Sequence, residues 1–566
     1  MLKGIAASAG IALGRVYKLE EPVLNYDMAS KGPDIEQADF DVAVTKTVHD
    51  IEAIKEGAIN NLSDEEAAIF DAHLMMIGDP EYTGQIKEMI NNGTSAVAAT
   101  KHISDQMIEM FLSMDNDYFK ERAADIKDVS YRLICNLLKV DIPNLSAIDH
   151  EVIILANDLT PSDTAQLNKK YTLGFVTEIG GRTSHSAIMA RSLEIPAIVG
   201  VGGIMNEVKK DDFIIMDAVK GEVIINPSKE VIDEYQRLRA DYLAEKEALK
   251  VLIDAKSVTL DGHEVEIACN IGTPKDVEGA LNNGAEGIGL YRTEFLYMDS
   301  HDDFPNEDAQ FEAYKEVLVG MKGKKVVVRT LDIGGDKRLD YFEFPPEMNP
   351  FLGYRAIRLC LDRQDIFKTQ LRALLRASAY GKLCIMFPMI ATVKEFLDAK
   401  AIFLAEKEKL QSEGVTIGED IELGMMVEIP SAAILADKFA EHADFFSIGT
   451  NDLIQYSMAA DRMSEKVSYL YQPLNPSILR LIKLTIDGAH KHNKWVGMCG
   501  EMAGDTLACP VLLGLGLDEF SMSASSILEA RKMIRALNKQ DMEKLAEEAL
   551  NKSNIDEVVT LIKNKL

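Results

Sequence analysis

Hydrophobic and polar positions divide the first 227 residues into two kinds of segment. Near both ends of this stretch, short β-branched and apolar runs stand between glycine-rich turns, and they predict strands. Between them, apolar residues recur at three- and four-residue spacing, which predicts a series of amphipathic helices. We therefore expect an α/β domain made of residues 1–20 and 145–227, into which an all-helical domain of residues 21–144 is inserted.

A single long helix is predicted next. Residues 228–255 consist mostly of strong helix formers, contain neither glycine nor proline, and follow Pro227, as is typical of a helix start. At 1.5 Å per residue, such a helix spans about 40 Å. Residues 228–258 are therefore interpreted as a rigid linker between domains that need to move.

The remaining residues, 259–566, alternate short apolar runs with helical stretches. Eight of the runs are typical of strands: VEIACNIG, GIGLYRTE, KVVVRTLDIGG, LCIMFPMI, LGMMVEIP, FFSIGTNDL, WVGMCGEM and DEFSMS. Eight β/α repeats over about 300 residues predict a closed (β/α)8 barrel. An open doubly wound sheet is the alternative that this pattern leaves. The expected fold is a multidomain α/β protein that ends in a barrel.

Composition excludes several classes of protein. The chain has 566 residues, of which 47% are hydrophobic, so each of several domains can bury a core. We find no apolar run of about 18 residues and no cleavable leader, and we therefore expect a cytoplasmic protein. A net charge of -30 repels nucleic acid and anionic lipid. The six cysteines are too scattered for a zinc site or a disulfide framework, which indicates reduced thiols.

Acidic residues are concentrated in the predicted helical domain. Residues 31–130 hold 21 Asp and Glu against 8 Lys and Arg, a net charge of -13. Such charge most often marks solvated helix faces. A docking face for a basic partner is the alternative.

One histidine stands where a phosphate would bind. The segment GGRTSHSAIMARSLEIP, residues 180–196, predicts a tight turn and a helix that Thr183 or Ser184 can cap. His185 falls at the start of this helix, where unpaired N–H groups and the helix dipole favour anions. We interpret His185 as a phosphohistidine. The alternative is a histidine that only hydrogen-bonds the turn.

Cations follow the predicted barrel strands at the end where barrel enzymes place their working residues. Arg292 ends the second run, Arg329 ends the third, and Arg462 follows the sixth. Arginine can bind phosphate or carboxylate through two parallel hydrogen bonds. The alternative for any one of them is a salt bridge to a barrel acid. After Arg329, the motif RTLDIGGDK continues with Asp332, Asp336 and Lys337.

Two carboxylates occupy equivalent positions. Glu428 ends the fifth run, and Asn451 and Asp452 follow the sixth. Carboxylates from adjacent strands offer the hard oxygen ligands that Mg²⁺ takes in ones or twos beside substrate oxygens and water. We predict that Glu428 and Asp452 hold Mg²⁺ and that nearby arginines keep them ionised. General acid and base catalysis by the pair is the alternative.

A cysteine completes the candidate site. Cys499 ends the seventh run between Gly497 and Gly500, which are expected to leave backbone room for a ligand. A lone cysteine most often only packs. Together, however, the arginines, the metal pair and a thiol acid suit phosphoenolpyruvate. Loss of its phosphoryl group leaves an enolate that must be protonated at carbon to give pyruvate, and Cys499 is the predicted acid.

The chain closely resembles the enzyme I family of the phosphoenolpyruvate:sugar phosphotransferase system, over essentially its whole length. The motifs that carry the resemblance are GGRTSHSAIMARSLEIP, GIGLYRTEFL, RTLDIGGDK, NPFLGYRAIR, IGTNDLIQY and GMCGEMAGD. The resemblance implies that His185 takes the phosphoryl group from phosphoenolpyruvate and passes it to a histidine of the phosphocarrier protein HPr. The other roles that it implies are substrate contacts at Arg292, Arg329, Asn451, Asp452 and Arg462, magnesium at Glu428 and Asp452, and proton donation by Cys499.

The resemblance also implies two protein contacts. HPr is expected to dock on the inserted helical domain, and the barrel domain is expected to form a homodimer. Candidate docking residues are Glu65, Glu66, Asp71, His73, Met75 and Asp79.

Two other functions are considered. A pyruvate phosphate dikinase or phosphoenolpyruvate synthase shares the histidine and barrel domains but requires an ATP-binding domain, and the helical segment offers no Gly-rich phosphate loop. A non-catalytic regulatory relative would bind carrier or metabolite without turnover. The presence of Glu428, Asp452, Arg462 and Cys499 together speaks against it.

Overall fold

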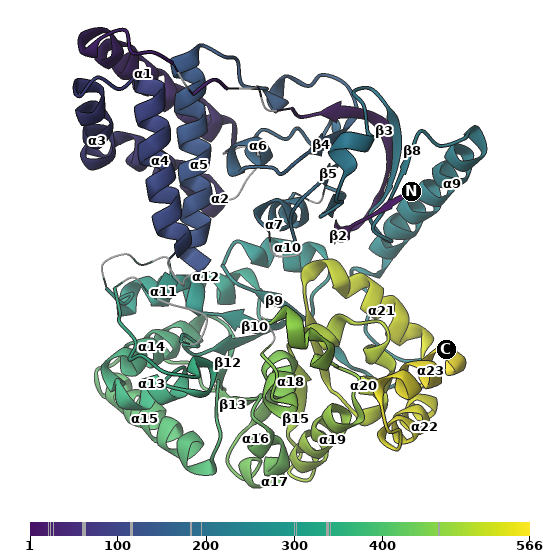
Figure 1. The fold of residues 1–566 in the computed structure, drawn as a ribbon. Coiled ribbons are helices and arrows are strands. Elements are labelled where there is room, and N and C mark those ends of the chain that lie inside the picture. The colour runs from purple at the N-terminus through teal and green to yellow at the C-terminus, as the bar shows by residue number, and fades with distance from the viewer. Residues whose placement is uncertain are drawn as a thin grey trace. The chain divides into compact units, whose positions relative to one another are not determined.

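The computed structural model covers residues 1–566 and divides into two compact units, Met1–Glu245 and Lys246–Leu566 (Figure 1). It describes every residue except 21, 23, 27, 59–63, 114–116, 182–183, 194, 299, 301–302, 335–338, 340 and 462–463. The helical residues whose side chains also lie outside the described part are 56–58, 64–69, 113, 117–122, 124, 161, 185, 188, 192 and 465.

The first unit contains a mixed sheet with the strand order β1-β8-β7-β3-β4-β5-β6-β2. Its strands are β1 (Leu2–Lys3), β2 (Ile5–Ser8), β3 (Ile11–Lys18), β4 (Val152–Ala156), β5 (Thr172–Thr177), β6 (Ala197–Val199), β7 (Phe213–Asp217) and β8 (Glu222–Ile225). The four strands β3 to β6 are parallel. Alternate residues of β4 enter different apolar clusters, Ile154 in one and Ile153 in the other. Both faces of the sheet are therefore buried, which explains its continuous apolar runs.

In the described part of the insertion, five helices stand between β3 and β4 in the sequence, and these two strands nevertheless pair with each other. They are α1 (Pro33–Ala58), α2 (Asp64–Gly78), α3 (Pro80–Asn91), α4 (Ala96–Ser113) and α5 (Asp117–Leu138). These helices bury an apolar cluster of their own, which includes Phe40, Phe70 and Tyr82. An all-helical insertion in an α/β sheet is thus confirmed. Two short helices, α6 (Pro161–Ala165) and α8 (Ile204–Glu207), connect strands of the sheet.

The predicted linker helix forms α9 (Lys229–Leu249), followed by the 3-10 turn η2 (Lys250–Leu252). Tyr235 is its one buried residue. Among the residues that the structure describes, no helix has the length and apolar character needed to cross a membrane.

The second unit is built on a closed ring of eight parallel strands. They are β9 (Glu266–Ile271), β10 (Ile288–Arg292), β11 (Lys325–Arg329), β12 (Lys382–Phe387), β13 (Glu422–Val427), β14 (Phe445–Ile448), β15 (Trp495–Met498) and β16 (Glu519–Met522). Each overlaps one of the eight predicted runs, although β12 and β13 begin one residue before theirs, so the predicted barrel is confirmed. Its interior holds a small apolar cluster that includes Met386, Met426 and Cys499, as expected for a packed barrel core.

Helices surround this ring, and the larger apolar core lies between them and the strands. The helices are α10 (Asp276–Asn282), α11 (Glu294–Met298), α12 (Glu307–Gly320), α13 (Ile357–Asp362), α14 (Gln364–Ala377), α15 (Val393–Ser412), α16 (Pro430–Ile434), α17 (Ala436–Phe439), α18 (Thr450–Met458), α19 (Pro476–His490), α20 (Ala508–Leu515), α21 (Ile527–Ala536), α22 (Lys539–Leu550) and α23 (Ile555–Lys565).

A charged cluster lies at the N-terminal ends of the barrel strands. Lys325 begins β11, and its Nζ lies 2.8 Å from Oε2 of Glu266 and 2.8 Å from Oε2 of Glu519. The same nitrogen stands 3.6 Å from the ring centroid of Trp495. Residues at this end of a barrel typically serve stability rather than chemistry. We call Lys325, Glu266, Glu519 and Trp495 the floor cluster.

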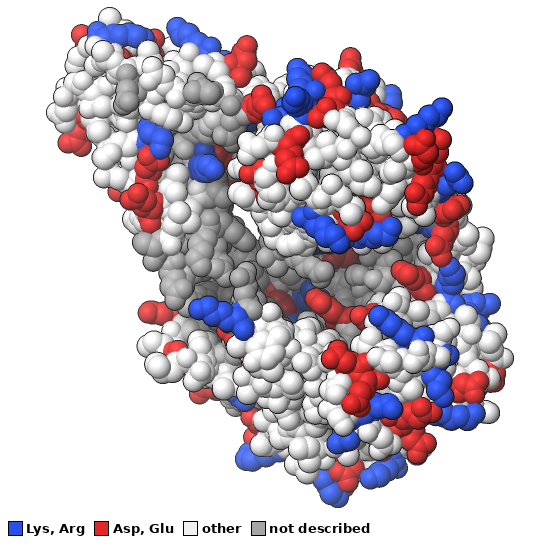
Figure 2. All heavy atoms as spheres, turned by 45° about the vertical axis from the view of Figure 1, so that its right-hand side comes forward, with Lys and Arg blue, Asp and Glu red and all other residues white. Residues whose placement is uncertain are grey.

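The distribution of surface charge and the burial of the cysteines can both be seen in the structure. On the face of the barrel unit drawn in Figure 2, acidic and basic side chains are interspersed. All six cysteines are buried and free, as expected for reduced thiols that pack as small hydrophobic residues.

Candidate active site

The predicted phosphohistidine segment forms a turn and a helix in the first unit. Gly180 occupies the turn with a φ of 117°, which is the region that glycine adopts readily. Ser184 caps α7 (His185–Ser192), because its side-chain oxygen accepts a hydrogen bond from a backbone N–H of the first turn. His185 is the first residue of this helix. Its side chain lies outside the described residues, as does all of Thr183, and its role stays a prediction.

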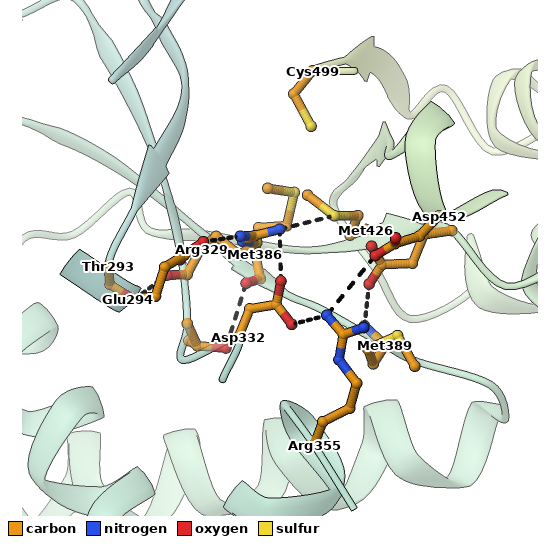
Figure 3. Close-up of polar contacts among 12 residues, drawn as sticks. Thr293, Glu294, Arg329, Asp332, Arg355, Met386, Met389, Met426, Asp452 and Cys499 are labelled. Carbon is orange, nitrogen blue, oxygen red and sulfur yellow. Dashed lines mark hydrogen bonds and ion pairs between the residues drawn. The ribbon is translucent and has the colours of Figure 1, made fainter. Parts of the chain in front are cut away.

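In the second unit, a network of buried charges lies at the carboxyl ends of the barrel strands (Figure 3). Arg329 ends β11 and is 7% exposed. Its Nη2 lies 2.5 Å from Oε1 of Glu294, and its Nη1 lies 3.0 Å from Oδ2 of Asp332. Arg329 therefore makes salt bridges to barrel acids, which the sequence left open as the alternative to binding an anionic substrate. These bridges hold a buried guanidinium in place beside the barrel interior.

A second buried arginine extends this network. Arg355 is 1% exposed, and its Nη2 lies 2.8 Å from Oδ1 of Asp332 and 3.8 Å from Oδ2 of Asp452. Asp332 thus lies between two guanidinium groups, as Figure 3 shows. An anionic ligand that replaced one of these carboxylates would meet arginines that are already desolvated and oriented.

Glu428 follows β13 and is buried beside the network. Its Oε1 accepts a hydrogen bond from the backbone N–H of Met389. Burial, and then the negative charges of Asp452 and Asp332, raise the pKa of Glu428 to about 8, against an opposing effect of the arginines. The arginines oppose this rise in the pKa of Glu428 but do not cancel it, because desolvation and the neighbouring carboxylates outweigh them.

The donor set at this end of the barrel fits magnesium. Within the described residues, no group of three or more His, Cys, Asp or Glu side chains could hold a metal by itself. Magnesium needs no such group, since one or two carboxylates with substrate oxygens and water are its usual ligands. Glu428 and Asp452 supply two hard oxygen donors that repel each other. A cation bound by both would remove that repulsion.

Cys499 follows β15 and is 5% exposed. Figure 3 shows its thiol pointing toward the charged network. Asn270 of β9 holds its peptide, because Nδ2 donates a hydrogen bond of 2.9 Å to the Cys499 carbonyl oxygen. Burial raises the pKa of Cys499 to about 11. The thiol therefore stays protonated at neutral pH and can serve as an acid.

The two glycines beside Cys499 have a different use from the one predicted. A Cβ on Gly497 would lie 2.7 Å from Oε1 of Glu519, and a Cβ on Gly500 would overlap the Thr450 side chain. Neighbouring side chains fill the space that these glycines leave. The expectation that they make room for a ligand is wrong.

Three further site residues were predicted. Arg292 ends β10, is exposed, and makes no ion pair with any residue in the described part of the chain. As the last residue of β10 it lies at the carboxyl end of the barrel strands, and its charge opposes the rise in the pKa of Cys499 that burial causes. Oδ1 of Asn451 accepts a hydrogen bond of 2.7 Å from the Tyr471 hydroxyl. Arg462 lies outside the described residues, as do Asp336 and Lys337.

Arg355 is the main site residue that the sequence analysis misses. It lies between β11 and β12 rather than at a strand end, so the strand-end rule passes over it. Arg355 can lie close to the chain at Gly334 because this residue has no side chain: it has a φ of 114°, and a Cβ added to it would lie 2.5 Å from the Arg355 Cβ. Paired glycines in RTLDIGGDK and an arginine in NPFLGYRAIR were the available signals.

The expected docking residues on the helical insertion differ in exposure. Met75 is 75% exposed, whereas His73 is 1% exposed and its Nε2 lies 3.3 Å from Oδ1 of Asp125. His73 therefore belongs to the helix core, and its prediction as a surface contact is wrong. Asp71 and Asp79 are exposed, and the side chains of Glu65 and Glu66 lie outside the described part.

Known proteins match this chain from end to end. Three family descriptions match: "PEP-utilising enzyme, N-terminal" at residues 3–122, "PEP-utilising enzyme, mobile domain" at 148–221, and "PEP-utilising enzyme, PEP-binding domain" at 246–539. The phosphoenolpyruvate-protein phosphotransferase of Staphylococcus carnosus (strain TM300) is 60% identical over 99% of this chain and 98% of its own. The chain belongs to the phosphoenolpyruvate-protein phosphotransferase family of enzymes.

A second member of the phosphoenolpyruvate-protein phosphotransferase family and a solved structure also match. The Bacillus subtilis (strain 168) member is 59% identical over 99% of each chain. A solution structure of Enzyme I (nEIt) is 42% identical over 43% of this chain and 99% of its own, with a TM-score of 0.39. Identity over the full length confirms the resemblance that the motifs indicate.

Proposed function

We propose that the chain moves the phosphoryl group of phosphoenolpyruvate to its own His185 and then to a histidine of HPr. This reaction would be the first step of phosphotransferase-system sugar uptake, in the cytoplasm. The observation that carries the proposal is a pair of buried arginines, Arg329 and Arg355, beside a buried and protonated thiol, Cys499. Guanidinium groups suit the phosphate and carboxylate of the donor, and the thiol suits the enolate that it leaves.

Substrate binding falls in this proposal to Arg292, Arg329, Arg462, Asn451 and Asp452. Arg292 is exposed and forms no ion pair within the described residues, so it can bind an anion without breaking a contact. Arg329 must instead exchange one of its carboxylate partners for the substrate. That exchange favours a ligand whose charge exceeds that of a single carboxylate.

The proposed chemistry balances with groups of this chain. The bond between phosphorus and the enol oxygen breaks as a bond forms to an imidazole nitrogen of His185. The Cys499 thiol then gives its proton to the methylene carbon of the enolate, which yields pyruvate, and the thiolate takes a proton from solvent. Burial that raises the Cys499 pKa to about 11 favours this return to the thiol.

Glu428 and Asp452 would hold the magnesium ion. When bound, magnesium supplies positive charge beside the phosphate and enolate oxygens. The mutual repulsion of the two carboxylates supports this assignment.

The proposed division of labour follows the predicted domains. Residues 1–20 and 145–227 carry the phosphohistidine, and residues 21–144 dock HPr. Residues 228–258 link these parts to the barrel of residues 259–566, which binds phosphoenolpyruvate and forms a homodimer. The boundary between the two compact units, at residues 245 and 246, supports a linker there. A family member named for a protein phosphotransferase also supports a protein acceptor.

Radiolabelled phosphoenolpyruvate tests this function. With magnesium, the full chain is expected to take up acid-labile, base-stable label, as a phosphohistidine does, and to pass it to HPr. The His185→Ala variant should remain unlabelled, while His150→Ala, which removes an exposed histidine of the same unit, should label normally. Equal labelling of His185→Ala and the wild type would refute the assignment. Labelling by ATP alone would favour a dikinase or synthase.

A further inference from the structure

A cleft in the first unit lies between the helical insertion and the α/β sheet. It encloses about 470 Å³, within the range of pockets that hold small metabolites. Its walls come from α1, from α5, from the connecting segment 140–146, and from residues 165–168, which begin at the last residue of α6. None of the residues assigned above to substrate, magnesium or carrier lines this cleft, so the proposed function leaves it unexplained.

Arg132 of α5 is the residue that points to a ligand. It lines the cleft and is only 8% exposed, yet within the described chain its guanidinium forms neither an ion pair nor a hydrogen bond. Burial raises the pKa of Asp163 and the charge of Arg132 opposes this rise, so this acid lies near Arg132, although no ion pair joins the two among the described residues. Oδ2 of Asp128 accepts a hydrogen bond from the Ser162 N–H, and Oδ2 of Asp163 accepts one from the Thr160 N–H. A guanidinium that lines a cleft and that no hydrogen bond holds is free to bind an anion directly.

A second cation lines the same cleft. Lys46 of α1 is exposed and makes no ion pair with any described residue. The acids in the wall are Asp50 and Asp141. Asp50 already accepts a hydrogen bond of 3.0 Å from Nδ2 of Asn136, and Asp141 is exposed. The cleft therefore offers two cations without an ion-pair partner among the described residues, beside Asp50, which has a hydrogen-bond partner, and the exposed Asp141.

We propose that this cleft binds a small anionic metabolite through a carboxylate or phosphate group. Arg132 would donate two parallel hydrogen bonds to that group, as arginine does to planar or tetrahedral oxyanions, and Lys46 would supply the second positive charge. Because α1, α5 and the segments that follow the insertion all contact the ligand, its binding stabilises their arrangement within the first unit.

Hydrogen–deuterium exchange of the full chain, read by mass spectrometry, tests the proposal. The probes are inorganic phosphate and malonate, each compared with sodium chloride at the same ionic strength, because salt alone screens charges. At a probe concentration equal to its Kd, exchange that requires the cleft to open should slow by about twofold. The slowing is expected in peptides that cover 140–146 and 165–168.

Matched variants decide the result. Arg132→Gln should abolish the slowing, and Lys46→Gln, at an exposed position that does not threaten folding, should weaken it. Arg237→Gln, which removes an exposed arginine of α9, should leave it unchanged. A response to phosphate alone assigns a phosphorylated ligand, and a response to malonate alone assigns a carboxylic acid.

Three results would overturn the proposal. They are slowing that chloride reproduces, slowing that survives in both Arg132→Gln and Lys46→Gln, and slowing confined to peptides of the barrel mouth.

Discussion

Replacement of Lys325 by methionine tests whether the floor cluster stabilises the closed barrel. Lys325 Nζ is shared between Glu266 and Glu519, at 2.8 Å from each. Glu519 is 1% exposed, so without Lys325 its carboxylate is a buried charge with no cation beside it. Removing one partner of a buried pair costs about 3–5 kcal/mol of unfolding free energy.

This cost converts into a measurable change in melting temperature. Unfolding of residues 246–566 gains on the order of 0.7 kcal/mol per kelvin of entropy at the midpoint. A loss of about 4 kcal/mol therefore lowers the melting temperature of the barrel by about 6 °C. Differential scanning calorimetry of the full chain measures this change.

The control is Lys382→Met, at the exposed first residue of the adjacent strand β12, with an expected change below about 1 °C. The pH supplies a second check. Burial raises the pKa of Glu519 to about 6, and Lys325 opposes that rise, so in the variant this carboxyl protonates at still higher pH. The folded state then binds more protons than the unfolded state, and the deficit of Lys325→Met shrinks from about pH 8 to about pH 5. An unchanged melting temperature, or a deficit independent of pH, would refute the reasoning.

Three further predictions concern the thiol and a half-buried carboxyl. Cys499→Ala should slow pyruvate release by about 10²- to 10⁴-fold while calorimetric titration still detects phosphoenolpyruvate binding; normal pyruvate release would exclude Cys499 as the acid. Burial raises the pKa of Cys499 to about 11, so iodoacetamide at about pH 8 should alkylate it more than about 100-fold more slowly than free cysteine. Mass analysis of the peptides measures this rate, and alkylation as fast as that of free cysteine would mean that the thiolate is already present. Burial and the charge of Asp128 raise the pKa of Asp163 to about 6. As the pH rises from about 4 to about 6, the free energy of unfolding should therefore fall by about 3 kcal/mol, since the folded state holds the proton more tightly than the unfolded state does. Denaturant titrations of Asp163→Asn should lack this slope, and a slope equal to that of the wild type would contradict the assignment.

The barrel could be predicted because its strands carry a simple pattern. Each strand is covered on both faces, so it forms a short continuous apolar run, and helical stretches separate the runs. All strands of a parallel barrel end at the same edge, which brings together residues that follow different runs. Nη1 of Arg329 lies 3.6 Å from Sδ of Met426, and Nη2 of Arg355 lies 3.8 Å from Oδ2 of Asp452. Both contacts show that residues distant in sequence lie close together at this edge.

Pairing within the site could not be predicted in the same way, because it depends on how the loops return over the barrel. Arg355 reaches Asp332 only because the chain after β11 passes close to it at Gly334. Glycine carries the same ambiguity wherever it occurs, since the missing side chain can admit a ligand or a neighbour. Beside Cys499 the neighbours are Glu519 and Thr450. The positions of strand ends therefore predict which residues gather at the mouth of the barrel. The ion pairs that these residues make with one another, which a substrate would have to displace, depend on packing that the sequence pattern does not reveal.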